Sequence, residues 1–355
     1  MAQTDAPIRW PLLGLVGATA ALSALWLRAR RRRAEQGERL RAEKNCKKHL
    51  SPSASEPRAA APRPFRVLRQ PLPLRTSDAA ILTRRLSDGE RDGQMLSRET
   101  MAWAKETLTR SGVLCLTNFM TPAGAEAARA TVAPHWDRLH SGYVAPYEEH
   151  HGAGLPTDQF AEVVQRSAKR YDMKLTPEFA KAYRKVLHGR ILSSLVAQAL
   201  GPGQHGAFQD GVVVSMPGAA LQQRHADSPH LYDPKFHGWL PPFVCNAFVP
   251  LVDLTPTNGC TAFATGSHIL AHSGWMSAPL PQWPQHYTQL NAPAGSLILF
   301  DCRTYHCGLP NEGDAARPIM YSLWAKNWYS ESYFGTRSLV AETEAGMHGG
   351  LQAGV

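Results

Sequence analysis

Apolar positions recur at helical spacing in several segments between residues 98 and 200. Residues 98–111 follow Ser97 as a helix cap, and Met101, Ala104 and Leu108 repeat at intervals of three or four. Residues 112–119 form a short, apolar, β-prone run. A second helix is predicted from Thr121 to about residue 139, and a third over residues 177–200. These segments predict a helical layer that precedes the sheets.

The pattern changes after residue 203 to short β-prone runs separated by Gly, Pro and Asn, which is typical of a strand-rich barrel or sandwich. The predicted strands are residues 208–216, 221–227, 244–254, 260–266, 296–302 and 319–329. The expected fold class is therefore mostly β with flanking helices.

The N-terminal segment has the pattern of a membrane anchor. Residues 11–27 carry no charge, an aromatic residue stands at each edge (Trp10 and Trp26), and five arginines follow between residues 28 and 33. The prediction is a hydrophobic helix with a basic cluster over residues 1–33, crossing the membrane once, with the rest of the chain on the cytoplasmic side. A cleaved secretory signal would carry its charge before the apolar run; an organellar targeting sequence is the alternative.

The remaining chain divides by composition into three parts. Residues 34–64 are charged and then rich in Pro, Ala and Ser, as in a linker. Residues 65–335 are expected to form the folded domain, and residues 336–355 a flexible tail.

Charge and cysteine content exclude some classes of protein. Residues 1–64 hold 13 Lys or Arg against 5 Asp or Glu, and the rest holds 25 against 24. The body is nearly neutral, so nucleic acid is not an expected partner. The six cysteines form no C-x-x-C pair, which favours buried thiols over a disulfide framework or zinc knuckle.

Three side chains form a candidate metal site. His225 and Asp227 are two residues apart, so an extended backbone places both on one face. This pair is common by chance and needs a third ligand, which His306 supplies 79 residues after Asp227. Two imidazoles and one carboxylate that leave metal positions open suit Fe(II) and O2 chemistry. Iron is favoured over zinc, and no further catalytic side chain is expected.

Arg317 follows His306 by 11 residues and opens the next predicted strand. A guanidinium is the best partner for the free carboxylate of a dicarboxylate that chelates iron through its 2-oxo acid end. An antiparallel return from His306 to Arg317 would bring both side chains to one barrel mouth. Arg317 is therefore the candidate anchor for 2-oxoglutarate.

The segment from about residue 112 to 329 resembles the phytanoyl-CoA dioxygenase family of Fe(II)- and 2-oxoglutarate-dependent oxygenases. The resemblance rests on GVLCLTNFMTPAGAEAARA (112–130), the H-A-D at residues 225–227, NGCTAFATGSHIL (258–270), AGSLILFDCRTYHCG (294–308) and the Arg that follows. Two positions depart from the usual pattern: Ala226 stands where many members have Gln, and Thr265 where Pro is usual.

The resemblance implies a double-stranded β-helix (jelly-roll) core, with iron at His225, Asp227 and His306 and the 2-oxoglutarate carboxylate at Arg317. It also implies O2 as oxidant, ascorbate as an optional reductant, and hydroxylation of a small-molecule or lipid-like substrate with release of succinate and CO2.

Substrate contacts are expected in the loop after the H-A-D, at His230, Tyr232 and Trp239, and residues 271–290 are interpreted as a long loop over the site. His268 is interpreted as structural. Two alternative functions remain open: a catalytically silent, membrane-tethered binding protein of the same fold, and a metal-dependent hydrolase. Neither the substrate nor the oligomeric state can be inferred from the sequence.

Overall fold

The structure is a computed structural model that describes residues 79–156, 159–228, 231, 240–269 and 287–344. The predicted anchor (1–33) and linker (34–64) lie outside these residues. Within the described part of the chain, no helix has both the length and the apolar character needed to cross a bilayer.

Helices predominate in the described chain before residue 203, and strands predominate after it. The strands are β1 (Thr83–Arg85), β2 (Val113–Thr117), β3 (Val163–Ser167), β4 (Arg170–Lys174), β5 (His205–Ser215), β6 (Val244–Pro250), β7 (Thr261–Phe263), β8 (Thr288–Leu290), β9 (Leu297–Asp301), β10 (His306–Gly308) and β11 (Arg317–Lys326). The helices are α2 (Asp88–Gly93), α3 (Arg98–Ser111), α4 (Pro122–Leu139), the π-helix η1 (His140–Val144), α5 (Ala145–His151), α6 (Pro177–Leu187), α7 (Arg190–Leu200) and the 3-10 helix η3 (Ser267–Ile269).

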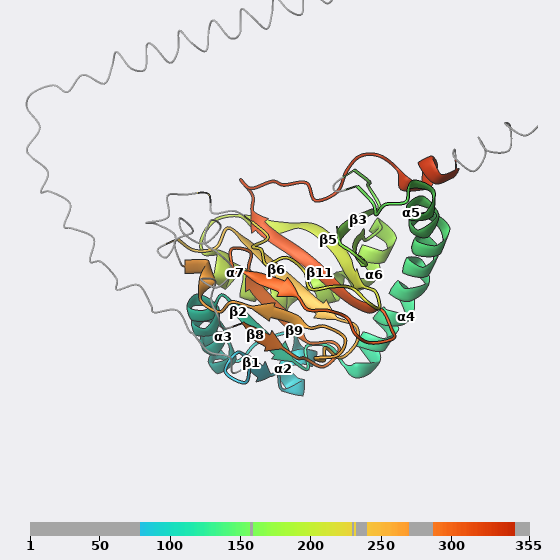
Figure 1. Cartoon of the computed structure of the whole chain (residues 1–355). Helices are drawn as coiled ribbons and strands as arrows, with labels where there is room; N and C mark the ends of the chain where they lie inside the picture. Colours follow the sequence, from blue (N-terminus) through green and yellow to red (C-terminus); the bar gives the residue numbers. More distant parts are fainter. Residues whose placement is uncertain (1–78, 157–158, 229–230, 232–239, 270–286, 345–355) are drawn as a thin grey trace, which may run out of the picture. The chain divides into compact units, whose positions relative to one another are not determined.

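The strands form two sheets. The larger has the order β1-β2-β9-β6-β11-β5-β4-β3 and the smaller the order β10-β7-β8. Backbone pairing between His225 and His306 adds the segment around residue 225 to the edge of the smaller sheet. From β5 to β11 the chain passes repeatedly between the two sheets, as in a jelly roll. The expected mostly-β core with flanking helices is confirmed (Figure 1).

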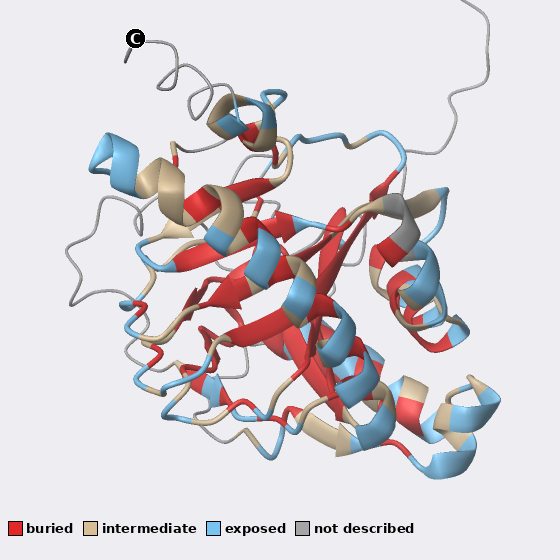
Figure 2. Ribbon diagram, turned by 90° about the vertical axis from the view of Figure 1, so that its right-hand side faces the viewer, coloured by how far each residue is buried: buried red, intermediate tan, exposed pale blue. Residues whose placement is uncertain are grey.

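Successive side chains on a strand of the larger sheet point to its opposite faces. On β6, Cys245, Ala247 and Val249 pack into a cluster that also contains residues of α3, α4 and α7. Val244 and Phe248 of the same strand belong to the cluster between the two sheets. Figure 2 shows buried strands in the interior and helices that expose their outer faces. The second cluster is the layer in which the candidate site lies.

The helix predicted over residues 177–200 is two helices, α6 and α7, and that prediction is wrong at their junction. Gly189 caps α7 in an extended conformation. A Cβ on Gly189 would lie 2.3 Å from the Lys185 carbonyl oxygen and 2.7 Å from Gln94 Oε1. The chain bends where only glycine allows this close approach.

Two more predictions need correction. Residues 221–227 form a single bridge at His225 instead of a strand. The predicted tail (336–355) is partly folded, since Leu339 is fully buried and Arg337 pairs with Phe160. The hairpin of β3 and β4, which extends the larger sheet, was not predicted from the sequence.

Candidate metal and anion site

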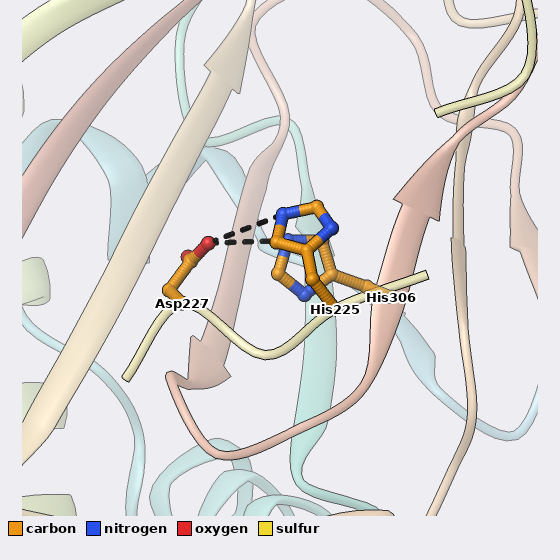
Figure 3. Close-up of side chains that lie close together, drawn as sticks. All are labelled: His225, Asp227 and His306. Carbon is orange, nitrogen blue, oxygen red and sulfur yellow. Dashed lines mark ion pairs between the residues drawn. The ribbon is translucent and has the colours of Figure 1, made fainter. Parts of the chain in front are cut away.

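The predicted ligands His225, Asp227 and His306 converge in the structure. His225 and His306 face each other across an antiparallel backbone pair, with N–H···O distances of 3.0 and 2.8 Å. Asp227 lies two residues further along and points at both imidazoles (Figure 3). One ligand atom from each of the three side chains lies within 4.8 Å of the others. Within the described residues, this is the group of His, Cys, Asp and Glu side chains that could hold a metal ion.

The orientation of each imidazole is fixed by its own backbone. The Nδ1 of His225 lies 2.8 Å from the carbonyl oxygen of Gln223, and the Nδ1 of His306 lies 3.0 Å from that of Thr304. A carbonyl accepts only, so each Nδ1 carries the proton and each Nε2 presents its lone pair. The two Nε2 atoms lie 3.6 and 3.5 Å from Asp227 Oδ1. These separations are long for a hydrogen bond and short enough for the three groups to share one ion.

Asp227 uses its two oxygens differently. Oδ1 faces the imidazoles, while Oδ2 accepts a 3.0 Å hydrogen bond from Asn246 Nδ2 on β6. The carboxylate is thereby held with one oxygen directed toward the other two ligands. Such an outer hydrogen bond is a regular feature of metal-binding carboxylates.

The protonation states suit cation binding. Burial lowers the pKa of His306 to about 4, so the ring is neutral at physiological pH. Burial alone would raise the pKa of Asp227, but His306 and His225 outweigh it and hold that pKa below its ordinary value. His225 differs: burial disfavours its charged form, but Asp227 raises its pKa above the ordinary value. Metal binding requires the neutral ring, so an ion at this site would compete with the proton that Asp227 favours on His225.

Arg317 begins β11 and is 2% exposed. Its Nε and Nη1 have no hydrogen-bond partner, and no carboxylate of the described residues forms an ion pair with it. Burial, and then the neighbouring charge of Arg170, lowers the pKa of Arg317 to about 9. A buried guanidinium without an anion is costly, so this pocket suits a carboxylate ligand.

The predicted route from His306 to Arg317 is wrong, although both side chains reach the same cavity. β10 pairs with β7 in the smaller sheet, whereas β11 pairs with β5 and β6 in the larger one. The two residues face each other from opposite sheets instead of lying on an antiparallel pair.

The cavity that holds these groups has a volume of about 360 Å³. Phe248, Ile319 and Leu323 form part of an apolar wall. Another part of the lining is polar. Arg166 donates two hydrogen bonds to Asp172 Oδ2 (3.1 and 2.8 Å), and the Tyr321 hydroxyl donates one to Asp172 Oδ1 (3.0 Å). The lining is thus mixed, with hydrogen-bonding side chains next to the metal cluster.

Sequence reasoning missed several cavity residues. Arg166, Arg170 and Asp172 lie on the unpredicted β3–β4 hairpin, where polar residues alternate with buried apolar ones. Asn246 was detectable as a single amide within the apolar run VCNAFVP. The expected substrate contacts His230, Tyr232 and Trp239 lie outside the described residues. His268 is buried and directs Nε2 at the Thr109 carbonyl oxygen (3.1 Å), which agrees with a structural role.

Comparison with known sequences finds a family model and relatives that match this chain. The family model described as "Phytanoyl-CoA dioxygenase (PhyH)" matches residues 108–319. "Dioxygenase trt7" of Aspergillus terreus (strain NIH 2624 / FGSC A1156) is 27% identical over 217 residues, which is 60% of this chain and 69% of that protein. "Dioxygenase FrzG" of Cladobotryum sp is 26% identical over 168 residues, 46% of this chain and 53% of that protein. The chain therefore spans about half the length of the second relative.

The solved structures to which this chain is similar include the epimerase SnoN in complex with Fe3+, alpha ketoglutarate and nogalamycin RO. Its TM-score is 0.48 at 16% identity, over 65% of this chain and 85% of that one. HygX from Streptomyces hygroscopicus, with nickel and 2-oxoglutarate bound, has a TM-score of 0.48 at 13% identity, over 66% and 89% of the two chains.

Proposed function

The chain belongs to the phytanoyl-CoA dioxygenase family of non-haem iron, 2-oxoglutarate-dependent oxygenases, and we propose that it hydroxylates a small molecule that carries polar groups. In this proposal His225, Asp227 and His306 hold the iron, and Arg317 binds the distal carboxylate of 2-oxoglutarate. The observation that carries it is the convergence of three metal-competent side chains and one unpaired buried guanidinium on a single cavity.

The residues of this chain position and shield the reactants. The Nε2 atoms of His225 and His306 and Oδ1 of Asp227 present lone pairs to one point, and Arg317 orients the co-substrate from the opposite sheet. Phe248, Ile319 and Leu323 exclude water from that side of the cavity. Iron held there would supply the oxidative chemistry with O2 as the oxidant: one oxygen atom would enter succinate, formed from 2-oxoglutarate with loss of CO2, and the other would become the hydroxyl group of the substrate.

Polar lining supports the substrate class. The cavity of about 360 Å³ is shared with the co-substrate and contains Gln165, Gln223 and the Arg166–Asp172 pair. Hydrogen-bonding groups that line a cavity favour a ligand with polar groups of its own. A compact polar molecule fits this lining better than a long acyl chain does. A membrane anchor at residues 1–33 stays a prediction, and the proposed substrate class does not depend on it.

The alternatives explain the site less well. A metal-dependent hydrolase would have no use for an unpaired guanidinium opposite the metal ligands. A silent binding protein would have no need for a complete ligand set with both imidazoles already oriented.

The proposal is tested by comparing the small-molecule metabolites of cells that produce the wild-type protein with those of cells that produce His306→Ala. Cells with the wild-type protein should accumulate a product that is one oxygen atom heavier than a depleted small molecule. The purified protein should convert 2-oxoglutarate to succinate when Fe(II), O2 and that molecule are supplied. His306→Ala should abolish both effects. An unchanged metabolite difference in cells that carry His306→Ala would refute the proposal.

A further inference from the structure

A second buried guanidinium lies beside Arg317. Arg170, on β4, is 1% exposed and lines the same cavity. In the larger sheet, Arg170 and Arg317 are both in register with Ser215 of β5, which lies between their strands. Residues in register on neighbouring strands point to the same face. The two arginines therefore lie side by side on the inner face of the sheet, across one strand.

Arg170 is held in place by neutral acceptors. Nη2 donates to the Leu309 carbonyl oxygen at 2.9 Å, and Nη1 contacts Ser167 Oγ (3.2 Å) and the Ala220 carbonyl oxygen (3.3 Å). No described carboxylate forms an ion pair with it, and its Nε has no hydrogen-bond partner. Hydrogen bonds fix the position of this guanidinium but leave its charge uncompensated.

Glycine at position 308 allows the guanidinium to lie against the backbone of the cavity wall. A Cβ on Gly308 would lie 2.9 Å from Arg170 Cζ and 3.1 Å from Nε. Gly308 itself lines the cavity, two residues after the ligand His306. The Arg170 guanidinium therefore packs directly against the end of β10, in the wall of the cavity.

Two adjacent buried cations without an anion would be an unusual structural device. Each positive charge raises the free-energy cost of burying the other, and the charge of Arg170 contributes to the depressed pKa of Arg317. Among the other arginines of the described residues, the buried Arg303 pairs with Asp301 and the half-buried Arg166 pairs with Asp172. The missing counter-charge is best supplied by a ligand.

We propose that Arg170 is a second anchor for the distal carboxylate of the co-substrate, so that Arg170 and Arg317 form one two-guanidinium site that selects a dicarboxylate. This inference rests on the proposed function. Arg170 is then a specificity-determining residue that distinguishes 2-oxoglutarate from 2-oxo acids that end in a methyl group.

A pair of ligands separates this role from a structural one. 2-Oxopentanoate has the same five-carbon chain and 2-oxo acid end as 2-oxoglutarate, with a methyl group in place of the distal carboxylate. Both are titrated calorimetrically, without O2, into the full chain loaded with Fe(II). Arg170→Gln should weaken 2-oxoglutarate by about tenfold or more and leave 2-oxopentanoate nearly unchanged. Arg170→Lys, which retains the charge, should recover part of the loss.

Equal weakening of both ligands, or of neither, would overturn the inference. Arg317→Gln serves as the reference: if it also leaves 2-oxoglutarate unchanged, the proposed function loses its anchor, whereas an effect at Arg317 alone refutes only the role of Arg170. If neither variant of Arg170 folds, a crystal structure of the wild-type protein with 2-oxoglutarate decides. The distal carboxylate should lie within hydrogen-bond distance of the Arg170 guanidinium, and a carboxylate bound by Arg317 alone would refute the inference.

Discussion

Asn246 shows how single buried residues define the site. It interrupts the apolar run of β6 and donates to Asp227 Oδ2, so the other carboxylate oxygen faces His225 and His306. Each histidine is oriented in the same way, by a hydrogen bond from Nδ1 to the carbonyl oxygen two residues before it. Every proposed ligand thus has one polar atom fixed by the protein and one left to bind.

Asn246→Ala is therefore expected to lower the affinity for Fe(II) by about 10- to 100-fold, because Asp227 loses the hydrogen bond that orients it. Anaerobic metal titration of the purified variant measures this. Asn327→Ala is the matched control, since that exposed amide bonds only Gln204 among the described side chains. An unchanged affinity in Asn246→Ala would show that Asp227 needs no such support.

The residues that sequence reasoning found and missed differ in how their neighbours are specified. The pair His225 and Asp227 is local, and His306 and Arg317 follow from motif order and interval. Arg170 and Asn246 matter only because β4 lies beside β5, and β6 beneath residue 227, and this sheet order is not encoded in any short segment. Long-range pairing decides which polar residues become neighbours.

Among the secondary-structure elements, the short helix η3 illustrates a tertiary contact that depends on protonation. His268 in η3 is buried and faces the Thr109 carbonyl oxygen near the end of α3. A Cβ on Gly112, the cap of α3, would lie 2.5 Å from His268 Nδ1. The ring therefore packs against the point where α3 ends and β2 begins, and burial lowers its pKa to about 4.

This depressed pKa predicts acid sensitivity. Above about pH 6.5 His268 is neutral in both states. As pH falls from there toward about 4, the unfolded chain binds the proton and the folded chain does not, so the free energy of unfolding decreases, by up to roughly 3 kcal/mol. Urea unfolding of the metal-free protein across this range measures the loss. His268→Gln should show a shallower dependence on pH; parallel curves for the two proteins would contradict the assignment.

The secondary structure was predictable where the pattern is local and failed where it is not. α3, with its Ser97 cap and Gly112 end, follows the periodicity of its own residues. Gly189 looks unremarkable within a helical pattern, yet its contact with Lys185 separates α6 from α7. Residues 221–227 have strand-like composition, but they form a β-bridge only at His225 and one further backbone hydrogen bond from Gln222 to Gly308.

At the scale of the whole domain, the three proposed metal ligands come from two parts of the chain that are distant in sequence. His225 and Asp227 lie in the connection between β5 and β6, whereas His306 begins β10, much later in the chain. An ion bound by all three would link these parts in the folded state only, so binding should stabilise the fold by mass action.

Fe(II) at 100 times its dissociation constant should raise the free energy of unfolding by about 2.7 kcal/mol, which corresponds to several degrees in Tm. Anaerobic thermal unfolding with and without the metal measures the shift. Asp227→Ala should lose most of it, because two imidazoles remain without the carboxylate. A variant that is stabilised as much as the wild type would indicate that the metal binds elsewhere.

The backbone hydrogen bonds that orient both histidines have a practical consequence for anyone who purifies this protein. They leave two imidazole nitrogens and one carboxylate oxygen to bind the ion, and donors of these types bind nickel and copper more tightly than ferrous iron. Protein eluted from a nickel resin should therefore arrive loaded with the wrong metal and inert, until a chelator strips it and iron is restored.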